Sequence, residues 1–288
     1  MITGSSFSGQ ALSGIISATE TAYLHKKTKT MANQTIKVTG IVIKETKTKE
    51  NDKIITVLTK ELGVIGIYVK GAMRLKNKFH SATGLFTYSE FVLFESRSSE
   101  LYQLNEATVK HIFHRLSTNV EYLALAMYMS ELVCEVTVPD DMNNEILRLF
   151  LNMLHMLTTQ KWSVSLCKAA FEMRLLSDTG YRPNLVGCKR CGKYETDMFF
   201  FDNENGEIIC GQCAKSYDKG YYIAEMPTIM ALRYLAYADL EKMFTFNITG
   251  AFRYQLCRIC EKYLLEHTRY DYKTLDFYKS VHIEEKLF

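Results

Sequence analysis

Two closely spaced cysteine pairs constrain this chain more than any other feature. The first is Cys188-Lys-Arg-Cys191, and the second, Cys210-Gly-Gln-Cys213, follows after eighteen intervening residues. Two thiolates three positions apart can bind one metal ion if the backbone turns tightly between them, and this spacing is typical of a structural zinc site. Two hairpin disulfides or four buried free thiols are the alternatives. The pattern favours Zn²⁺ bound by all four cysteines.

Glycines next to these cysteines favour the required turns. Gly192 directly follows the first pair and Gly211 lies within the second. Because glycine adopts a positive φ at no steric cost, we expect both to form tight turns. Four protein ligands would leave the ion no open coordination position, so the predicted role of the zinc is structural rather than catalytic.

The segment between the pairs has the pattern of a β-hairpin. Met198-Phe-Phe-Phe201 and Ile208-Ile209 are apolar, and Asn205-Gly206 lies between them as a turn signal. Two cysteine knuckles carried on a hairpin predict a zinc-ribbon-like module at about residues 184–220. Two roles stay open for this module: contact with nucleic acid, and support of the neighbouring segments.

Composition indicates an ordinary globular protein of a reducing compartment. The 288 residues are 47% hydrophobic and 23% charged, and no run of about eighteen apolar residues predicts a membrane span. Cys134 and Cys167 lie in apolar stretches of helical pattern, as free thiols usually do, which favours the cytoplasm. Residues 1–30 lack the pattern of a signal peptide, and we expect a disordered extension that precedes a second possible start at Met31.

The net charge of +3 is unevenly distributed. Residues 31–110 hold 12 Lys and Arg against 8 Asp and Glu, whereas residues 111–288 hold 20 against 23. A basic N-terminal half beside a weakly acidic remainder indicates one domain that faces a polyanion.

Residues 31–110 have the pattern of a small β-barrel. Five short apolar or alternating segments, with glycine near the bends, are typical of a barrel of the OB type. A generic small barrel or sandwich is the alternative. The predicted strands are 35–43, 53–58, 64–69, 88–94 and 101–104.

From Val120 the apolar period becomes helical, and residues 111–288 are expected to form a helical bundle that carries the zinc module. The fold class is therefore a multidomain α+β protein. After the helix that begins near Val120, the predicted helices are 144–157, 163–176, 228–240 and 251–267.

The densest basic stretch follows the third predicted strand. Lys70, Arg74, Lys76 and Lys78 lie in one loop with Phe79, and such a loop can lay cations along a phosphate backbone and offer a ring for stacking. A solvated surface loop is the alternative. Two further cations of the same half, Lys44 and Lys53, complete the predicted DNA contacts.

Enzyme signatures are mostly missing. Gly66 and Gly71 have the spacing of a P-loop, but Ala72-Met73 replaces the Lys-Ser/Thr that would bind phosphate and Mg²⁺. A third pair, Cys257-Arg-Ile-Cys260, is a possible redox dithiol, although two buried core cysteines in a helix explain it better. The aromatic residues of the C-terminal half fit helical packing, and some could line a groove for a partner peptide.

Several segments together resemble the RecO family of bacterial recombination mediators. The likeness covers about residues 34–270 and leaves out the extension and the last residues. The segments that carry it are Glu50-Asn-Asp-Lys-Ile-Ile-Thr-Val-Leu-Thr59, Gly63-Val-Ile-Gly66, Lys70-Gly-Ala-Met-Arg74, Phe86-Thr-Tyr-Ser-Glu-Phe91, Thr179-Gly180-Tyr-Arg-Pro183 and the four cysteines.

The resemblance implies an OB-fold DNA-binding domain and a helical domain with a zinc finger. It implies a non-catalytic protein at the nucleoid that binds single- and double-stranded DNA, anneals complementary strands and loads RecA onto strands coated by single-strand-binding protein. Implied partners are RecR, RecA-coated DNA and the acidic, phenylalanine-ended tail of the coating protein. By position, the likeness assigns phosphate contacts to Lys70, Arg74, Lys76 and Lys78, and zinc to Cys188, Cys191, Cys210 and Cys213.

Two other functions compete with this interpretation. One is an RNA- or ribosome-associated protein with OB and zinc-ribbon modules, which a preference for structured RNA would favour. The other is an enzyme that uses the dithiol of Cys257 and Cys260, which oxidative cycling of those thiols would reveal.

Overall fold

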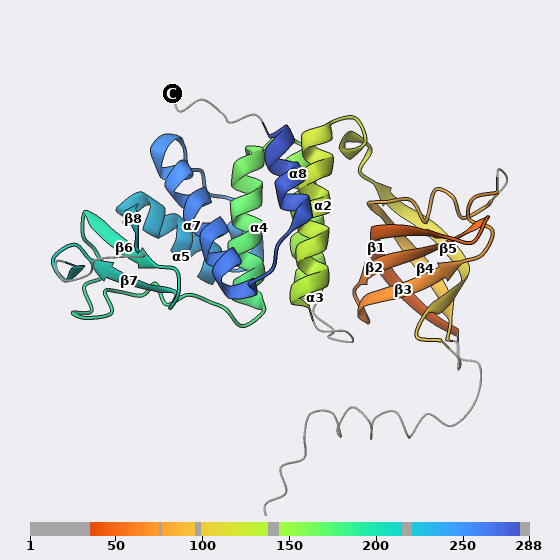
Figure 1. Cartoon of the computed structure of the whole chain (residues 1–288), viewed down its shortest axis with the longest axis horizontal. Helices are drawn as coiled ribbons and strands as arrows, with labels where there is room; N and C mark the ends of the chain where they lie inside the picture. Colours follow the sequence, from red (N-terminus) through yellow and green to blue (C-terminus); the bar gives the residue numbers. More distant parts are fainter. Residues whose placement is uncertain (1–34, 75–76, 96–98, 138–143, 215–220, 283–288) are drawn as a thin grey trace, which may run out of the picture. The chain divides into compact units, whose positions relative to one another are not determined.

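The computed structural model describes residues 35–74, 77–95, 99–137, 144–214 and 221–282 (Figure 1). The extension expected at residues 1–30 lies outside these residues. The domain limits 31–110 and 111–288 stay predictions.

Five strands form a closed barrel in the order β1-β2-β3-β5-β4. Neighbouring strands are antiparallel except β3 and β5, which are parallel. An open sandwich is excluded, and this five-stranded barrel with its non-sequential order confirms the OB fold. The strands are β1 (Thr35–Thr48), β2 (Asp52–Thr59), β3 (Gly63–Val69), β4 (Thr87–Phe94) and β5 (Tyr102–Ile112).

Alternate side chains along the strands point inward and fill the barrel. In β3, Ile65, Ile67 and Val69 are buried, whereas the residues between them are half-buried. Because successive side chains of a strand point to opposite faces, Tyr68 lies on the outer face of the barrel. The interior is aliphatic with one large ring, Phe91, which is fully buried.

The helical region follows a short 3-10 helix, η1 (His114–Leu116). Helices α2, α3 and α4 lie where the apolar period predicts them, and Ser163 caps α4 by accepting a hydrogen bond from the backbone N–H of Leu166 at 3.3 Å. The helices are α2 (Val120–Val136), α3 (Asn144–Thr158), α4 (Val164–Asp178), α5 (Met226–Tyr237), α6 (Leu240–Met243), α7 (Gly250–Thr268) and α8 (Lys273–Val281).

The helix expected over residues 228–240 differs from the structure, and several short elements were not predicted. Helix α5 ends at Tyr237, and α6 begins separately at Leu240. Helix α8 and a strand, β8 (Tyr221–Glu225), are not revealed by the periodicity of apolar residues, because each is short and buries few residues.

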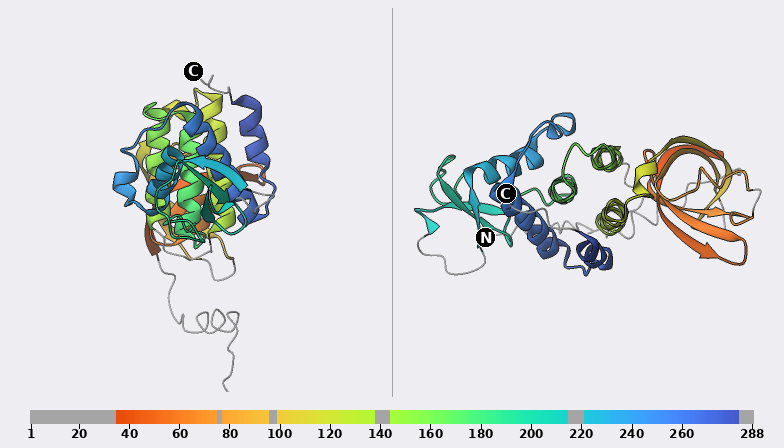
Figure 2. Two further views of the ribbon diagram at one scale, coloured as in Figure 1. Left: turned by 90° about the vertical axis from the view of Figure 1, so that its left-hand side faces the viewer. Right: turned by 90° about the horizontal axis from the view of Figure 1, so that it is seen from above.

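Helix α4 is the centre of the helical region. It contacts α2, α3, α5 and α7 (Figures 1 and 2), and almost every one of its side chains is buried. The burial extends to three charged residues, Lys168, Glu172 and Arg174. No described helix is long and apolar enough to cross a membrane.

The cysteine pairs flank a three-stranded sheet of order β7-β6-β8. The expected hairpin is confirmed: β6 (Met198–Asp202) pairs with β7 (Glu207–Cys210), and Gly206 in the turn has φ +64°. The third strand, β8, pairs with β6 and leads directly into α5.

Candidate functional site

The four cysteines of the two pairs converge on one point. The Sγ atoms of Cys188, Cys191, Cys210 and Cys213 all lie within 4.8 Å of one another. All eight cysteines are free, which excludes the disulfide alternative, and Cys191 is exposed, which argues against four buried core thiols. The cluster can therefore hold a metal ion.

Tight turns are present at both glycines, but only one of the two glycines has a positive φ. Gly192 has φ +71°, and its N–H donates to the carbonyl of Cys188 at 2.8 Å. Gly211 lies in a turn that the Cys213 N–H closes by donating to the Cys210 carbonyl at 2.9 Å. It does not adopt a positive φ, so only that part of the expectation is wrong. Its N–H instead donates to the carbonyl of Met198 at 3.1 Å, because the hairpin pairing continues into the second knuckle.

The backbone around Cys188 favours a thiolate. Burial alone would raise the pKa of Cys188, but the N–H groups of Cys210, Cys191 and Arg190 outweigh burial and lower it to about 6. The N–H of Cys210 lies 3.3 Å from the Cys188 sulfur. Hydrogen bonds with the Cys210 and Cys191 thiols and then burial raise the pKa of Cys213 to about 12, and the charge of Cys188 contributes least. A bound cation would favour the thiolate form of all four cysteines.

A buried arginine of α5 joins the cysteine module to the helices. The Arg233 guanidinium donates to the carbonyls of Leu185 at 2.7 Å, Val186 at 3.3 Å and Tyr194 at 2.8 Å. It also stacks over the Tyr194 ring, 3.9 Å from the centroid. Only 7% of Arg233 is exposed, so this side chain acts as an internal clamp on the first knuckle.

The predicted basic loop lies at the end of β3, and its backbone is held from within. Asp52 accepts a hydrogen bond from the N–H of Gly71 at 2.7 Å. The Asn77 side chain donates to the Gly71 carbonyl at 2.6 Å and accepts from the Phe79 N–H at 2.6 Å. These hydrogen bonds fix the backbone of the loop at Gly71 and at Phe79.

Three of the cations predicted for this loop point to solvent. Lys70, Arg74 and Lys78 are exposed, and the Lys78 ammonium lies 4.7 Å from the centroid of the Phe79 ring. Lys76 lies outside the described residues. Exposed cations of this kind can contact a phosphate backbone.

The two cations predicted on the strands differ. Lys44 on β1 is exposed. Lys53 on β2 is only 6% exposed, and its ammonium donates to the Thr83 carbonyl at 2.6 Å and pairs with Glu45 at 3.2 Å. Lys53 cannot reach a phosphate without breaking these bonds, so we remove it from the predicted contacts.

Sequence reasoning missed an aromatic residue beside this loop. The Tyr68 hydroxyl donates to Asp52, and the Lys49 ammonium lies 5.9 Å from the Tyr68 ring centroid. The N–H of Gly71 and then the Tyr68 hydroxyl lower the pKa of Asp52, with help from Lys49 and Lys70. The alternation of apolar residues along β3 could have revealed Tyr68. It places the ring on the outer face of the barrel, two residues before the basic loop begins at Lys70.

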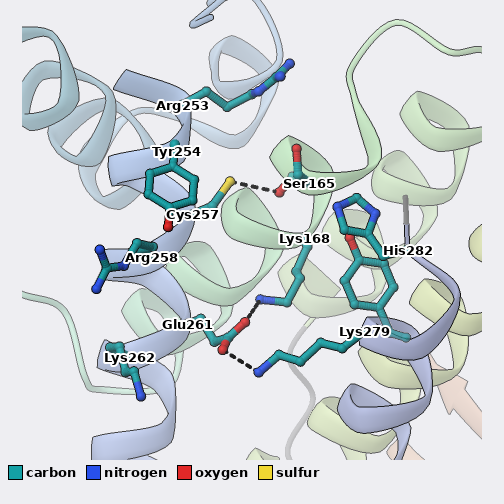
Figure 3. Close-up of a pocket in the computed structure, with 11 residues that line it drawn as sticks. Ser165, Lys168, Arg253, Tyr254, Cys257, Arg258, Glu261, Lys262, Lys279 and His282 are labelled. Atoms are coloured by element: carbon teal, nitrogen blue, oxygen red, sulfur yellow. Dashed lines mark hydrogen bonds and ion pairs between the residues drawn. The ribbon is translucent and has the colours of Figure 1, made fainter. Parts of the chain in front are cut away.

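A basic pocket lies among α4, α7 and α8 (Figure 3). Its volume is about 450 Å³. At its floor the Glu261 carboxylate pairs with the ammonium groups of Lys168 at 2.8 Å and Lys279 at 2.6 Å. The Tyr278 ring lines it too, and the buried Tyr278 hydroxyl makes no hydrogen bond within the described residues. The charged lining residues are Lys168, Arg253, Arg258, Glu261, Lys262 and Lys279, with His282 beside them.

The third cysteine pair lies partly in this pocket. The Cys257 thiol donates to the Ser165 carbonyl at 3.4 Å, and burial raises its pKa to about 11. Burial also raises the pKa of Cys260 well above its usual value. Because a redox dithiol needs a thiolate, these values support the interpretation of Cys257 and Cys260 as core cysteines.

Comparisons with known proteins agree with both halves of the structure. The family described as Recombination protein O N terminal matches residues 31–113, and Recombination protein O C terminal matches residues 117–276. A protein of Acetivibrio thermocellus named DNA repair protein RecO is 33% identical over 246 residues, which cover 85% of this chain and 97% of the relative. The chain belongs to the RecO family.

Membership of the RecO family confirms the resemblance and supports a role in DNA repair or recombination. A second relative of the same name, from Alkaliphilus metalliredigens, is 30% identical over 247 residues, which cover 85% of this chain and 99% of the relative. The N-terminal match contains the OB barrel with its basic loop. The C-terminal match contains the cysteine cluster and the helices α4 and α7 of the pocket.

Proposed function

We propose that this chain is a non-catalytic recombination mediator of DNA repair. It binds single- and double-stranded DNA, anneals complementary strands and helps to load RecA onto DNA coated by single-strand-binding protein. One observation carries the proposal: an OB barrel bears a loop whose described cations, Lys70, Arg74 and Lys78, face solvent. The steps of annealing and RecA loading, and RecR as a partner, rest on the family resemblance.

DNA lies along the basic loop of the barrel in this proposal. The phosphate contacts are Lys70, Arg74, Lys76 and Lys78, with Lys44 as a further cation. Neutralising the phosphates of two strands lowers their mutual repulsion, which favours annealing, and it releases counterions, which makes binding dependent on salt. No bond is made or broken, so the protein needs no catalytic residue.

Zinc is the metal that fits the cysteine cluster best. Zinc–thiolate bonds of about 2.3 Å place the sulfurs of a tetrahedral site about 3.8 Å apart. The Sγ atoms of Cys191 and Cys210 are 3.7 Å apart. With Cys188 and Cys213, these residues would hold the ion and leave no open position, so the zinc supplies rigidity and no chemistry.

The pocket among α4, α7 and α8 suits the acidic, phenylalanine-ended tail of single-strand-binding protein. Arg258 and Lys262 on α7 offer cations for its carboxylates, and the rings of Tyr254 and Tyr278 offer an apolar wall. This contact would bring the mediator to coated DNA at the nucleoid. Charged groups for steering and a ring for an apolar anchor are what a short peptide of this kind requires.

Binding of a labelled single-stranded oligonucleotide at several salt concentrations tests the proposal. A variant with alanine at Lys70, Arg74, Lys76 and Lys78 is compared with the wild type. Since each phosphate contact contributes about 0.7 to the logarithmic salt slope, the variant's slope should be shallower by up to about 3.

The matched control is a variant that loses four exposed cations of the helical region, at Lys161, Arg182, Lys242 and Lys273. It should keep the wild-type slope. No binding by the wild type at low salt would refute the proposed function, and tighter binding of structured RNA than of single-stranded DNA would favour an RNA-associated protein.

A further inference from the structure

Tyr68 is the one aromatic residue of β3, and it lies on the outer face of the barrel. Its neighbours in the strand, Ile67 and Val69, are buried in the barrel, whereas Tyr68 is half-buried. It pairs across the sheet with Ile54 on β2 and with Gln103 on β5. The ring therefore lies on the β2–β3 face, which OB folds use to bind oligonucleotides.

One carboxylate fixes both this ring and the start of the basic loop. The Tyr68 hydroxyl donates to one oxygen of Asp52, and the Gly71 N–H donates to the other at 2.7 Å. These two bonds orient the ring relative to the loop that begins at Lys70. Such restraint matters because a pre-ordered aromatic side chain loses less freedom when a ligand stacks on it.

One cation lies near the ring, and two cations offset the charge of Asp52. The Lys49 ammonium lies 5.9 Å from the centroid of the Tyr68 ring, and Lys49 and Lys70 both act electrostatically on Asp52. An aromatic ring beside cations is an arrangement that binds single-stranded nucleic acid, where the cations contact the backbone and bases stack on the ring.

We infer that Tyr68 is a stacking platform for an unpaired nucleobase and that Asp52 is its positioning residue. The inference rests on the proposed DNA binding by the barrel and adds a selectivity to it. Bases inside a duplex have both faces covered by their neighbours, so Tyr68 contributes to the binding of single strands and not to that of duplexes. The cations of the loop contribute to both.

Two substitutions of Tyr68 test the inference. Tyr68→Phe keeps the ring and loses the hydroxyl, whereas Tyr68→Leu loses the ring on a strand that tolerates leucine. Because stacking contributes about 1–3 kcal/mol per base, Tyr68→Leu should weaken binding of an oligothymidine by about 5- to 150-fold. Binding of a blunt duplex should change less than about twofold, and Tyr68→Phe should bind both DNAs within about threefold of the wild type.

The fluorescence of 2-aminopurine placed within the oligonucleotide reports the stacking directly. Its quenching on binding should persist in Tyr68→Phe and fall in Tyr68→Leu, while the salt slope stays at the wild-type value because no phosphate contact is lost. Tyr270→Leu, which removes a partly exposed tyrosine of the helical region, serves as the control and should change none of these readings.

The outcomes separate this inference from the proposed function. Equal losses for single strands and duplexes in Tyr68→Leu, or an unchanged affinity for single strands, would overturn the stacking role while the basic loop keeps its function. A wild-type protein that binds no DNA at low salt would overturn both.

Discussion

The basic loop of the barrel and the first cysteine knuckle look alike as sequences, yet they use their cations differently. Each combines glycine, lysine and arginine within a few residues. In the loop, Asp52 and Asn77 hold the backbone, which leaves Lys70 facing solvent. In the knuckle, Lys189 pairs with Glu207, and the backbone carbonyls are bound by Arg233. A dense run of cations is thus available to a polyanion only where neighbouring carboxylates do not already pair with it.

From this difference we propose that the cysteine module supports structure and that the basic loop supports binding. Loss of the metal should therefore have the largest structural effect and little effect on DNA. The following substitutions separate the two regions.

Replacing a buried cysteine of the proposed zinc site should give the largest effect. Cys210→Ser should reduce bound zinc from one equivalent to nearly none, because structural zinc binding contributes about 10–16 kcal/mol in isolated zinc-finger peptides and needs the complete thiolate set. Residues 184–214 should then become sensitive to protease, which mass spectrometry of the fragments can detect.

The control is Cys134→Ser, which alters an exposed cysteine outside the cluster and should keep the zinc. Single-stranded DNA affinity should change less than about threefold in either variant. A loss of DNA affinity in Cys210→Ser that matches the loss in the loop variant would show that the module takes part in binding, and the contrast between the two regions would fail.

Removing the arginine clamp should give an intermediate effect. Arg233→Ala leaves three carbonyls without their charged donor and removes the stack on Tyr194, and we expect a loss of about 3 kcal/mol in the free energy of unfolding. Arg233→Lys should recover only part of this loss, since an ammonium cannot reproduce the planar fork of the guanidinium.

Urea denaturation followed by circular dichroism measures both variants of Arg233. Equal stability of the lysine and alanine variants would mean that packing alone explains the effect of Arg233. Wild-type stability of the alanine variant would contradict the clamp itself.

The barrel and the cysteine cluster were predictable because their signals are local. Period-2 alternation marks β3, and the spacing of Cys188 and Cys191 fixes a ligand pair before any fold is known. The burial of Lys53 could not be predicted, because it depends on Thr83, thirty residues away in the sequence. The pocket among α4, α7 and α8 could not be predicted for the same reason. Helix α8 was not predicted, and its residues meet those of α4 only after folding.

The pocket provides the last and smallest test of the comparison, because its cations belong to the helical region but line an open cavity. Arg258 is exposed at this cavity, with the rings of Tyr222 and Tyr254 about 5.5 Å and 5.7 Å from its guanidinium carbon. Arg258→Ala should weaken binding of an acidic peptide that ends in phenylalanine by about tenfold, the effect of losing one charge-assisted contact of about 1.4 kcal/mol.

The control is Lys189→Ala, which removes a cation already paired with Glu207 and should leave the affinity unchanged. Fluorescence anisotropy of the labelled peptide measures both. If the two variants lost affinity equally, the peptide would be held by the overall charge of the helical region, and exposure of a cation in the pocket would not decide what it binds.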